Sequence, residues 1–135
     1  MNEVTPHQIL HPAGWKAARG YANGVAATGR TVHLGGTVGW DAQQQFVSDD
    51  FVGQARQCLR NIVDVLAEGG AGPEHLVRMT WYITSRDEYL THLAELGQAY
   101  REVIGRHYPA MAMVQVVALM EERAKVEIEA TAVLP

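Results

Sequence analysis

Two carboxylates near the end of the chain, Glu127 and Glu129, have the spacing that places both on one face of a β-strand. Within the stretch from Lys125 to Leu134, every second residue from Val126 onward is apolar, which predicts a strand with one apolar face and one polar face. A positioned carboxylate can act as a general acid or base, so Glu127 is the candidate catalytic residue. Glu129 is better explained as a charge at an interface or at the rim of a site.

Other reactive residue types form no recognisable constellation. The six histidines are scattered without metal-ligand spacing, so we expect no metal site. Cys58 falls beside the apolar stripe of a predicted helix, where a buried core thiol is the ordinary interpretation and a nucleophile would need an adjacent base. The Gly35-Gly36 pair lacks the extended spacing of a phosphate-binding loop, and we expect no cofactor.

Length and composition describe a single domain spanning residues 1–135, with 47% hydrophobic and 19% charged residues. The net charge of −4 argues against a nucleic-acid partner, which would require a basic surface. The sequence has no apolar run long enough to cross a bilayer and no signal-peptide pattern at its N-terminus, and it contains one cysteine. We therefore expect a cytoplasmic protein with no membrane partner.

Strand and helix patterns follow one another in the order strands, helix, strand, helix, strands. A helical period follows the cap Ser48-Asp49-Asp50 and another follows Ser85, ending near Gly69 and Gly105. Strand patterns occur at residues 20–27, from Thr31 onward, at 76–84, at 111–119 and at 125–134. The Gly29-Arg30 step between the first two strands has the composition of a hairpin turn.

This order predicts an α+β two-layer sandwich, in which two helices cover one face of a mixed sheet. The second face is left without a cover inside the chain, and we expect a closed oligomer to bury it. That face would carry Thr80, Tyr82, Glu127 and Glu129, together with alternate residues of the predicted strand 111–119. The strand pattern leaves two alternatives for the latter, which are Met111, Met113 and Gln115, or Ala112, Val114 and Val116.

Six segments together resemble the Rid family, also called YjgF or, in older usage, endoribonuclease L-PSP. They are residues 20–25, 34–39, 54–62, 77–83, Pro109-Ala110 and 126–130. The resemblance is collinear from about Pro12 to Val133. It implies a chorismate-mutase-like fold and a homotrimer with small-molecule clefts between neighbouring subunits.

The resemblance also implies an activity and some of its residues. Well-studied members hydrolyse reactive enamines and imines, such as 2-aminoacrylate, to a keto acid and ammonia without a cofactor. Glu127 matches the family's acidic residue that positions or activates the hydrolytic water. Tyr21 matches an aromatic residue of the cleft, and Gly35 and Gly36 fall where the backbone lines it.

The sequence departs from the family at the substrate clamp. Met111 stands where the family has an arginine that binds the substrate carboxylate, and a thioether forms no ion pair. Met113 replaces a cysteine, and Leu93 falls near an asparagine of the family. The predicted pocket is therefore more apolar, with Trp40 as a further candidate at its rim. Arg19, Arg78 and His33 are the candidate replacement cations.

Three functions remain open at this point. The first is a Rid-like hydrolase of an enamine or imine other than 2-aminoacrylate, with an apolar or aromatic small molecule as ligand. The second is a non-catalytic binding or regulatory trimer, favoured by Met111. The third is an endoribonuclease or translation inhibitor, against which the acidic net charge weighs.

Overall fold

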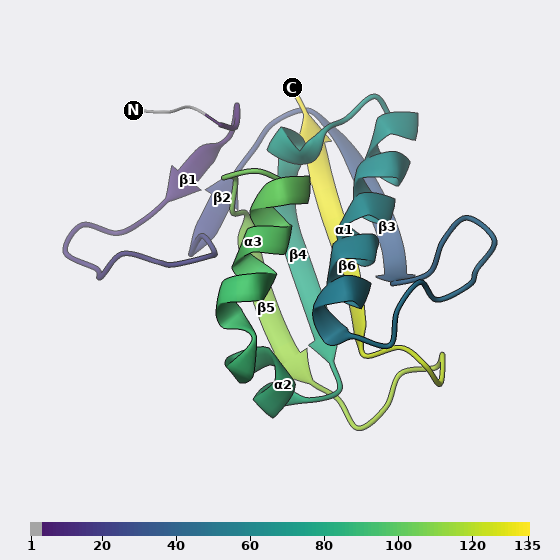
Figure 1. Ribbon diagram of the computed structural model, residues 1–135. Coiled ribbons are helices and arrows are strands. Elements are labelled where there is room, and N and C mark those ends of the chain that lie inside the picture. The colour runs from purple at the N-terminus through teal and green to yellow at the C-terminus, as the bar shows by residue number, and fades with distance from the viewer. Residues whose placement is uncertain (1–3) are drawn as a thin grey trace.

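The chain folds around a four-stranded mixed sheet, as a computed structural model of residues 4–135 shows (Figure 1). The strand order is β3-β6-β4-β5, with β4 and β5 parallel and the other pairs antiparallel. These strands are β3 (Arg30–Val38), β4 (Leu76–Ile83), β5 (Ala110–Gln115) and β6 (Val126–Leu134). The helices α1 (Phe51–Glu68), α2 (Arg86–Thr91) and α3 (Leu93–Val103) all cover one face. This is the predicted α+β two-layer sandwich.

The first helix begins and ends where the sequence predicts. The Asp50 carboxylate accepts a hydrogen bond from the Gly53 N–H at 2.8 Å, which satisfies one of the free donors of the first turn. Gly69 caps the other end. The apolar stripe between them, including Leu59 and Ile62, is fully buried against the sheet. No helix among residues 4–135 has the length and apolar character needed to cross a membrane.

The second predicted helix is broken in two. His92 caps the end of α2 with ψ 25°, outside the helical region, and α3 starts at the next residue. The His92 ring Nδ1 donates to the Glu88 carbonyl at 2.7 Å, and the Thr91 hydroxyl donates to the Asp87 carbonyl at 3.0 Å. Such side-chain bonds compete with the helical ladder, which explains why the apolar period alone did not reveal the break.

The predicted hairpin near Gly29 is wrong. β2 is only Gly24–Ala26 and pairs with β1 (Gln8–Leu10), a strand that the sequence pattern did not predict, whereas β3 pairs with β6. Gly29 therefore connects two separate sheets. The predicted strand 111–119 is also too long, because the chain leaves the sheet after Gln115 and forms an exposed loop.

Ala112 and Val114 of the second alternative set lie on the uncovered face of the sheet, whereas Val116 follows the end of β5. Thr80 pairs with Ala112 and Glu129, and Tyr82 pairs with Val114 and Glu127. Directly paired residues share a face, so these side chains stand together on the side without helices. We call this side the bare face. Met111 and Met113 pair with Met79 and Trp81 and therefore point toward the helices.

Candidate functional site

Glu127 stands on the bare face beside a break in the sheet register. The pairing of β3 with β6 shifts between Leu34 and Thr37, so Gly35 and Gly36 form a bulge. A Cβ atom added to Gly36 would overlap the carboxylate of Glu127, whereas one added to Gly35 would meet nothing within 4 Å. Glycine at position 36 therefore leaves the space in which the Glu127 carboxylate lies.

The two carboxylates of the bare face have different partners. Glu129 accepts a hydrogen bond from the Tyr82 hydroxyl at 2.9 Å, and this bond raises the pKa of Tyr82. Among residues 4–135, no side chain donates a hydrogen bond to the half-buried Glu127. Its oxygens are therefore available to a water molecule or a ligand, which is what a general base requires.

The thiol of Cys58, on α1, belongs to the core, as the sequence predicts. Cys58 has no exposed surface and its Sγ donates to the Thr37 carbonyl at 3.3 Å. Burial raises the pKa of the Cys58 thiol far above its ordinary value, and the negative charge of Glu127 adds to the effect. A thiol held protonated in this way is a poor nucleophile.

The predicted apolar site residues gather on the other side of the sheet, between α3 and β5. Leu93, Met111 and Met113 line one cavity of about 210 Å³, which we call the methionine cavity. Its remaining lining residues are Arg19, Gly20, Trp81, Tyr89, Leu96, Gly97, Tyr100 and Tyr108. Aromatic and thioether groups of this kind suit an apolar or aromatic ligand.

Glu127 and the methionine cavity lie on opposite faces of the same sheet. Glu127 pairs with Tyr82 on the bare face, whereas Met111 pairs with Met79 on the helix side. A residue cannot reach through a packed sheet to the other face, so one chain does not bring its own Glu127 and Met111 together. A single site that contains both residues requires a second copy of the chain.

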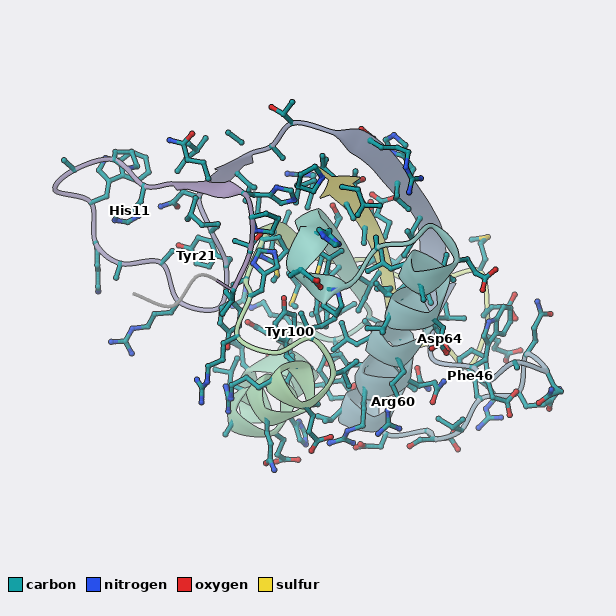
Figure 2. All side chains as sticks on the ribbon, turned by 90° about the horizontal axis from the view of Figure 1, so that it is seen from above. His11, Tyr21, Phe46, Arg60, Asp64 and Tyr100 are labelled. Atoms are coloured by element: carbon teal, nitrogen blue, oxygen red, sulfur yellow. The ribbon has the colours of Figure 1, made fainter. Side chains whose placement is uncertain are left out.

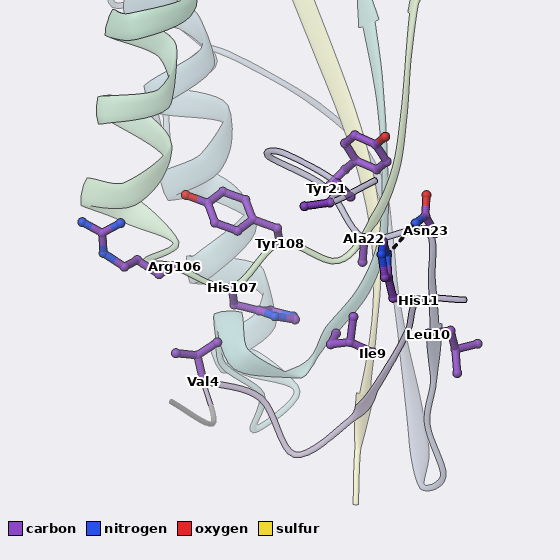
Figure 3. Close-up of a pocket in the computed structure, with 12 residues that line it drawn as sticks. Val4, Ile9, Leu10, His11, Tyr21, Ala22, Asn23, Arg106, His107 and Tyr108 are labelled. Atoms are coloured by element: carbon purple, nitrogen blue, oxygen red, sulfur yellow. Dashed lines mark hydrogen bonds between the residues drawn. The ribbon is translucent and has the colours of Figure 1, made fainter. Parts of the chain in front are cut away.

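Tyr21 lines a neighbouring cavity of about 320 Å³ at the base of the N-terminal loop (Figure 3). The Ala22 N–H donates to the Pro109 carbonyl at 3.0 Å, and Ala22 forms a parallel bridge with Ala110. This anchor fixes the loop beside the start of β5. Tyr108 lines both cavities, whereas Tyr21 is not among the residues that line the methionine cavity.

The remaining candidates are dispersed. Trp40 follows β3 and packs on Phe46 with ring centroids 5.8 Å apart, and it is not among the residues that line the methionine cavity. Arg78 and His33 line a shallow hollow of about 220 Å³ on the bare face, next to Glu129. Of the three candidate cations, only Arg19 lies at the methionine cavity.

Sequence reasoning did not assign Trp81, Tyr89, Tyr100 and Tyr108 to a site. The sequence places Trp81 in a strand, and although the tryptophans could line a cleft for an aromatic ligand, a large aromatic residue is more often part of a core or an interface. The feature of the sequence that could have drawn attention to Trp81 is its indole N–H, which needs a hydrogen-bond acceptor when the ring is buried. Across residues 4–135 no three His, Cys, Asp or Glu side chains gather as a metal site.

Comparisons with known proteins agree on one family. The family model described as endoribonuclease L-PSP matches residues 12–134. Protein DfrA of Myxococcus xanthus is 35% identical over 120 residues, covering 87% of this chain and 88% of the relative. The 2-iminobutanoate/2-iminopropanoate deaminase of Capra hircus is 30% identical over 127 residues, covering 93% and 89%. A structure from Yersinia pestis, a protein of unknown function of the conserved Rid family, has a TM-score of 0.83 at 30% identity, covering 95% and 98%.

Proposed function

The chain belongs to the Rid family, whose model is described as endoribonuclease L-PSP, and from this membership we propose that it hydrolyses a reactive imine or enamine to a carbonyl compound and ammonia. The Capra hircus relative is named for the deamination of 2-iminobutanoate and 2-iminopropanoate. The observation that carries the proposal is the Glu127 carboxylate, which lies over Gly36 on the bare face without a donor among the described residues.

The reaction needs only groups that this position supplies. Glu127 accepts a proton from water as the water oxygen bonds to the imine carbon, and it returns this proton to the nitrogen as the C=N double bond becomes a single bond. Glu127 then moves the hydroxyl proton of this carbinolamine to the nitrogen, so that the C–N bond breaks, the C=O double bond forms and ammonia leaves. An enamine enters the same route after it is protonated on carbon. One carboxylate that moves protons between oxygen and nitrogen is sufficient.

We further propose that the site is assembled between chains in a homotrimer. Val114 on the bare face is 45% exposed and lies among half-exposed side chains, a surface that a second copy would cover. Since Glu127 and the methionine cavity lie on opposite faces, a ring of chains would place the Glu127 of one chain next to the cavity of its neighbour.

Methionine at position 111 shapes the expected substrate. Its thioether offers no charge to a carboxylate, and the cavity around it is lined mainly by apolar and aromatic groups. We therefore propose a substrate with a larger apolar or aromatic body than 2-aminoacrylate. The preference would appear as faster ammonia release from imines of phenylalanine or leucine than from the imine of alanine.

The test generates imino acids with an amino-acid oxidase and measures whether the protein accelerates ammonia release. Glu127→Gln keeps the shape of the side chain and removes the base, so the acceleration should fall by about 100-fold or more. Glu129→Gln is the matched control on the same strand face and should retain the activity. Equal acceleration by wild type and Glu127→Gln would remove Glu127 from the mechanism.

A non-catalytic binding trimer is the second candidate, and the apolar lining at Met111 favours it. In this case the cavity would hold an apolar metabolite without turnover. Thermal-shift measurements with a metabolite panel would show saturable stabilisation, while the same compounds or their imines released no ammonia. Turnover of any stabilising imine would exclude this candidate.

A further inference from the structure

The cavity beside Tyr21, of about 320 Å³, lies between the N-terminal loop and the segment that leads into β5 (Figure 3). We call it the loop cavity. The loop carries His11 and Tyr21 and projects from one side of the domain, with Phe46 on the opposite side (Figure 2). The volume suits a small molecule, since pockets of roughly 300–1,000 Å³ are usual for such ligands. The lining is mainly apolar and includes Val4, Ile9, Leu10, Ala17, Ala18 and Ala22.

His107 lines the loop cavity and is held in one tautomer. Its side chain is 3% exposed, and its Nε2 atom lies 2.7 Å from the Leu76 carbonyl oxygen. A carbonyl oxygen can only accept a hydrogen bond, so the ring proton is on Nε2 and the neutral ring has an acceptor at Nδ1. Burial lowers the pKa of His107, which keeps the ring neutral near pH 7.

The Nδ1 atom of His107 has no hydrogen-bond partner among residues 4–135. Within these residues, the Trp81 Nε1 atom is the sole side-chain nitrogen or oxygen that is both unpaired and fully buried. His107 Nδ1 therefore keeps some accessible surface. The ring is directed toward Ile9, which also lines the loop cavity, whereas Arg106 points away (Figure 3). The accessible acceptor is thus open to the loop cavity.

The other imidazole of the loop cavity is already paired. Asn23 Nδ2 lies 3.1 Å from His11 Nδ1, and His11 Nε2 lies 3.0 Å from the Trp15 carbonyl oxygen. No aspartate or glutamate is among the described residues that line the cavity. An acceptor that is largely withdrawn from water and has no donor loses free energy, which a donor on a bound molecule would restore.

We infer that the loop cavity binds a small apolar or aromatic molecule that donates one hydrogen bond, from an N–H or O–H group, to Nδ1 of His107. The apolar lining would cover the body of this molecule. A neutral ligand is favoured, because no carboxylate of the described lining faces a cation and the Arg106 guanidinium points away. The site is separate from the proposed catalytic site, since neither Glu127 nor Met111 lines it.

The experiment is a ¹H–¹⁵N NMR titration with two probes of the same bicyclic shape. Indole has a ring N–H, whereas benzofuran has an oxygen in its place and no donor. Indole should shift the backbone signals of Ala22 and Asn23 saturably and bind about 5- to 10-fold more tightly than benzofuran, which is the effect of one hydrogen bond.

His107→Gln removes the acceptor and keeps the structural bond. The amide nitrogen of glutamine can take the place of Nε2 and donate to the Leu76 carbonyl, but no atom replaces Nδ1. Indole should therefore bind this variant only as tightly as benzofuran does, while benzofuran binding changes by less than about twofold. His33→Gln makes the same substitution at an exposed histidine outside the loop cavity and should change neither affinity.

A pH series on the wild-type protein tests the acceptor without any substitution. The titratable and charged groups around the His107 ring are His7, His11, Glu74, His75, Tyr100, Arg106 and Tyr108. Protonation of the ring places a proton on Nδ1, so indole loses its acceptor. Because the pKa of His107 is lowered, indole affinity should stay constant down to the ordinary value of 6.5 and fall below it. Benzofuran affinity should not change over this range.

Four results would overturn the inference. They are the absence of saturable shifts at Ala22 and Asn23 with millimolar indole, equal affinities of the two probes for the wild type, unchanged indole binding in a folded His107→Gln variant, and identical pH profiles for the two probes. The first two need no variant, so they apply even if His107→Gln does not fold.

Discussion

The two faces of the sheet are made from alternate residues of the same strands, and they differ in almost every property. On β6, Ile128 has no exposed surface and packs under the helices, while its neighbour Glu127 stands half-exposed on the bare face. The helix side is complete within one chain. The bare face holds unpaired polar groups and exposed apolar ones, as expected of a surface that another copy completes.

This contrast separates the residues that maintain the fold from those that do chemistry. Burial explains the core side chains between the helices and the sheet, such as Ile128, without reference to function. On the bare face, the glycine at position 36 and the free carboxylate of Glu127 have no comparable role in packing. Substitutions on the two faces should therefore affect different measurements.

The largest effect on stability is expected at Ile128. Ile128→Ala should lower the free energy of unfolding by about 3 kcal/mol, because it removes buried methyl groups and leaves a cavity. Ile128→Val should lower it by about 1 kcal/mol. Chemical denaturation measures both values, and a change below about 0.5 kcal/mol for the alanine variant would contradict the packing described here.

The adjacent glycines offer a sharper test of the bare face. Gly36→Ala should displace the Glu127 carboxylate and reduce ammonia release by roughly 10- to 100-fold, since small misplacements of a catalytic group have effects of this size. Gly35→Ala places its methyl group in open space and should leave the rate within about twofold. Equal rates for the two variants would show that the position of Glu127 does not matter.

A smaller effect should appear at alkaline pH. Burial, and then the charge of Glu127, raises the pKa of Cys58, so above about pH 9 the native thiol keeps a proton that the unfolded chain loses. The free energy of unfolding should therefore fall as pH rises beyond that point, by at most about 1.4 kcal/mol per pH unit from this group. The free energy of unfolding of the Cys58→Ala variant should fall less steeply over the same pH range. Identical slopes would mean that Cys58 titrates normally.

Much of the fold was predictable because buried apolar residues recur in the sequence with the period of a helix or of a strand. The helix that begins after Asp50 and the alternation along β4 and β6 follow directly from apolar spacing. The break at His92 and the pairing of β2 with β1 were missed, because both depend on side-chain hydrogen bonds and on contacts between distant segments.

The candidate site could be predicted only in part from the sequence. Residue types and the family resemblance selected Glu127 and Met111, but neither could say that they occupy opposite faces of one sheet. Arg19 could be named only as one of three possible cations, because the bridge that brings it to the cavity joins segments almost ninety positions apart. The lack of a hydrogen-bond partner for the Trp81 indole N–H among residues 4–135 can be seen only in the folded structure.

Subunit complementation tests the shared site most directly. Glu127→Gln removes the base, and Leu93→Trp fills the methionine cavity from a half-exposed position. Each variant alone should release no ammonia above background. After unfolding and refolding in an equal mixture, about one quarter of the sites in a random ring would pair an intact Glu127 with an intact neighbouring cavity, and about one quarter of the wild-type activity should return. Two individually folded, inactive variants that stay inactive after mixing would contradict a site built from two chains.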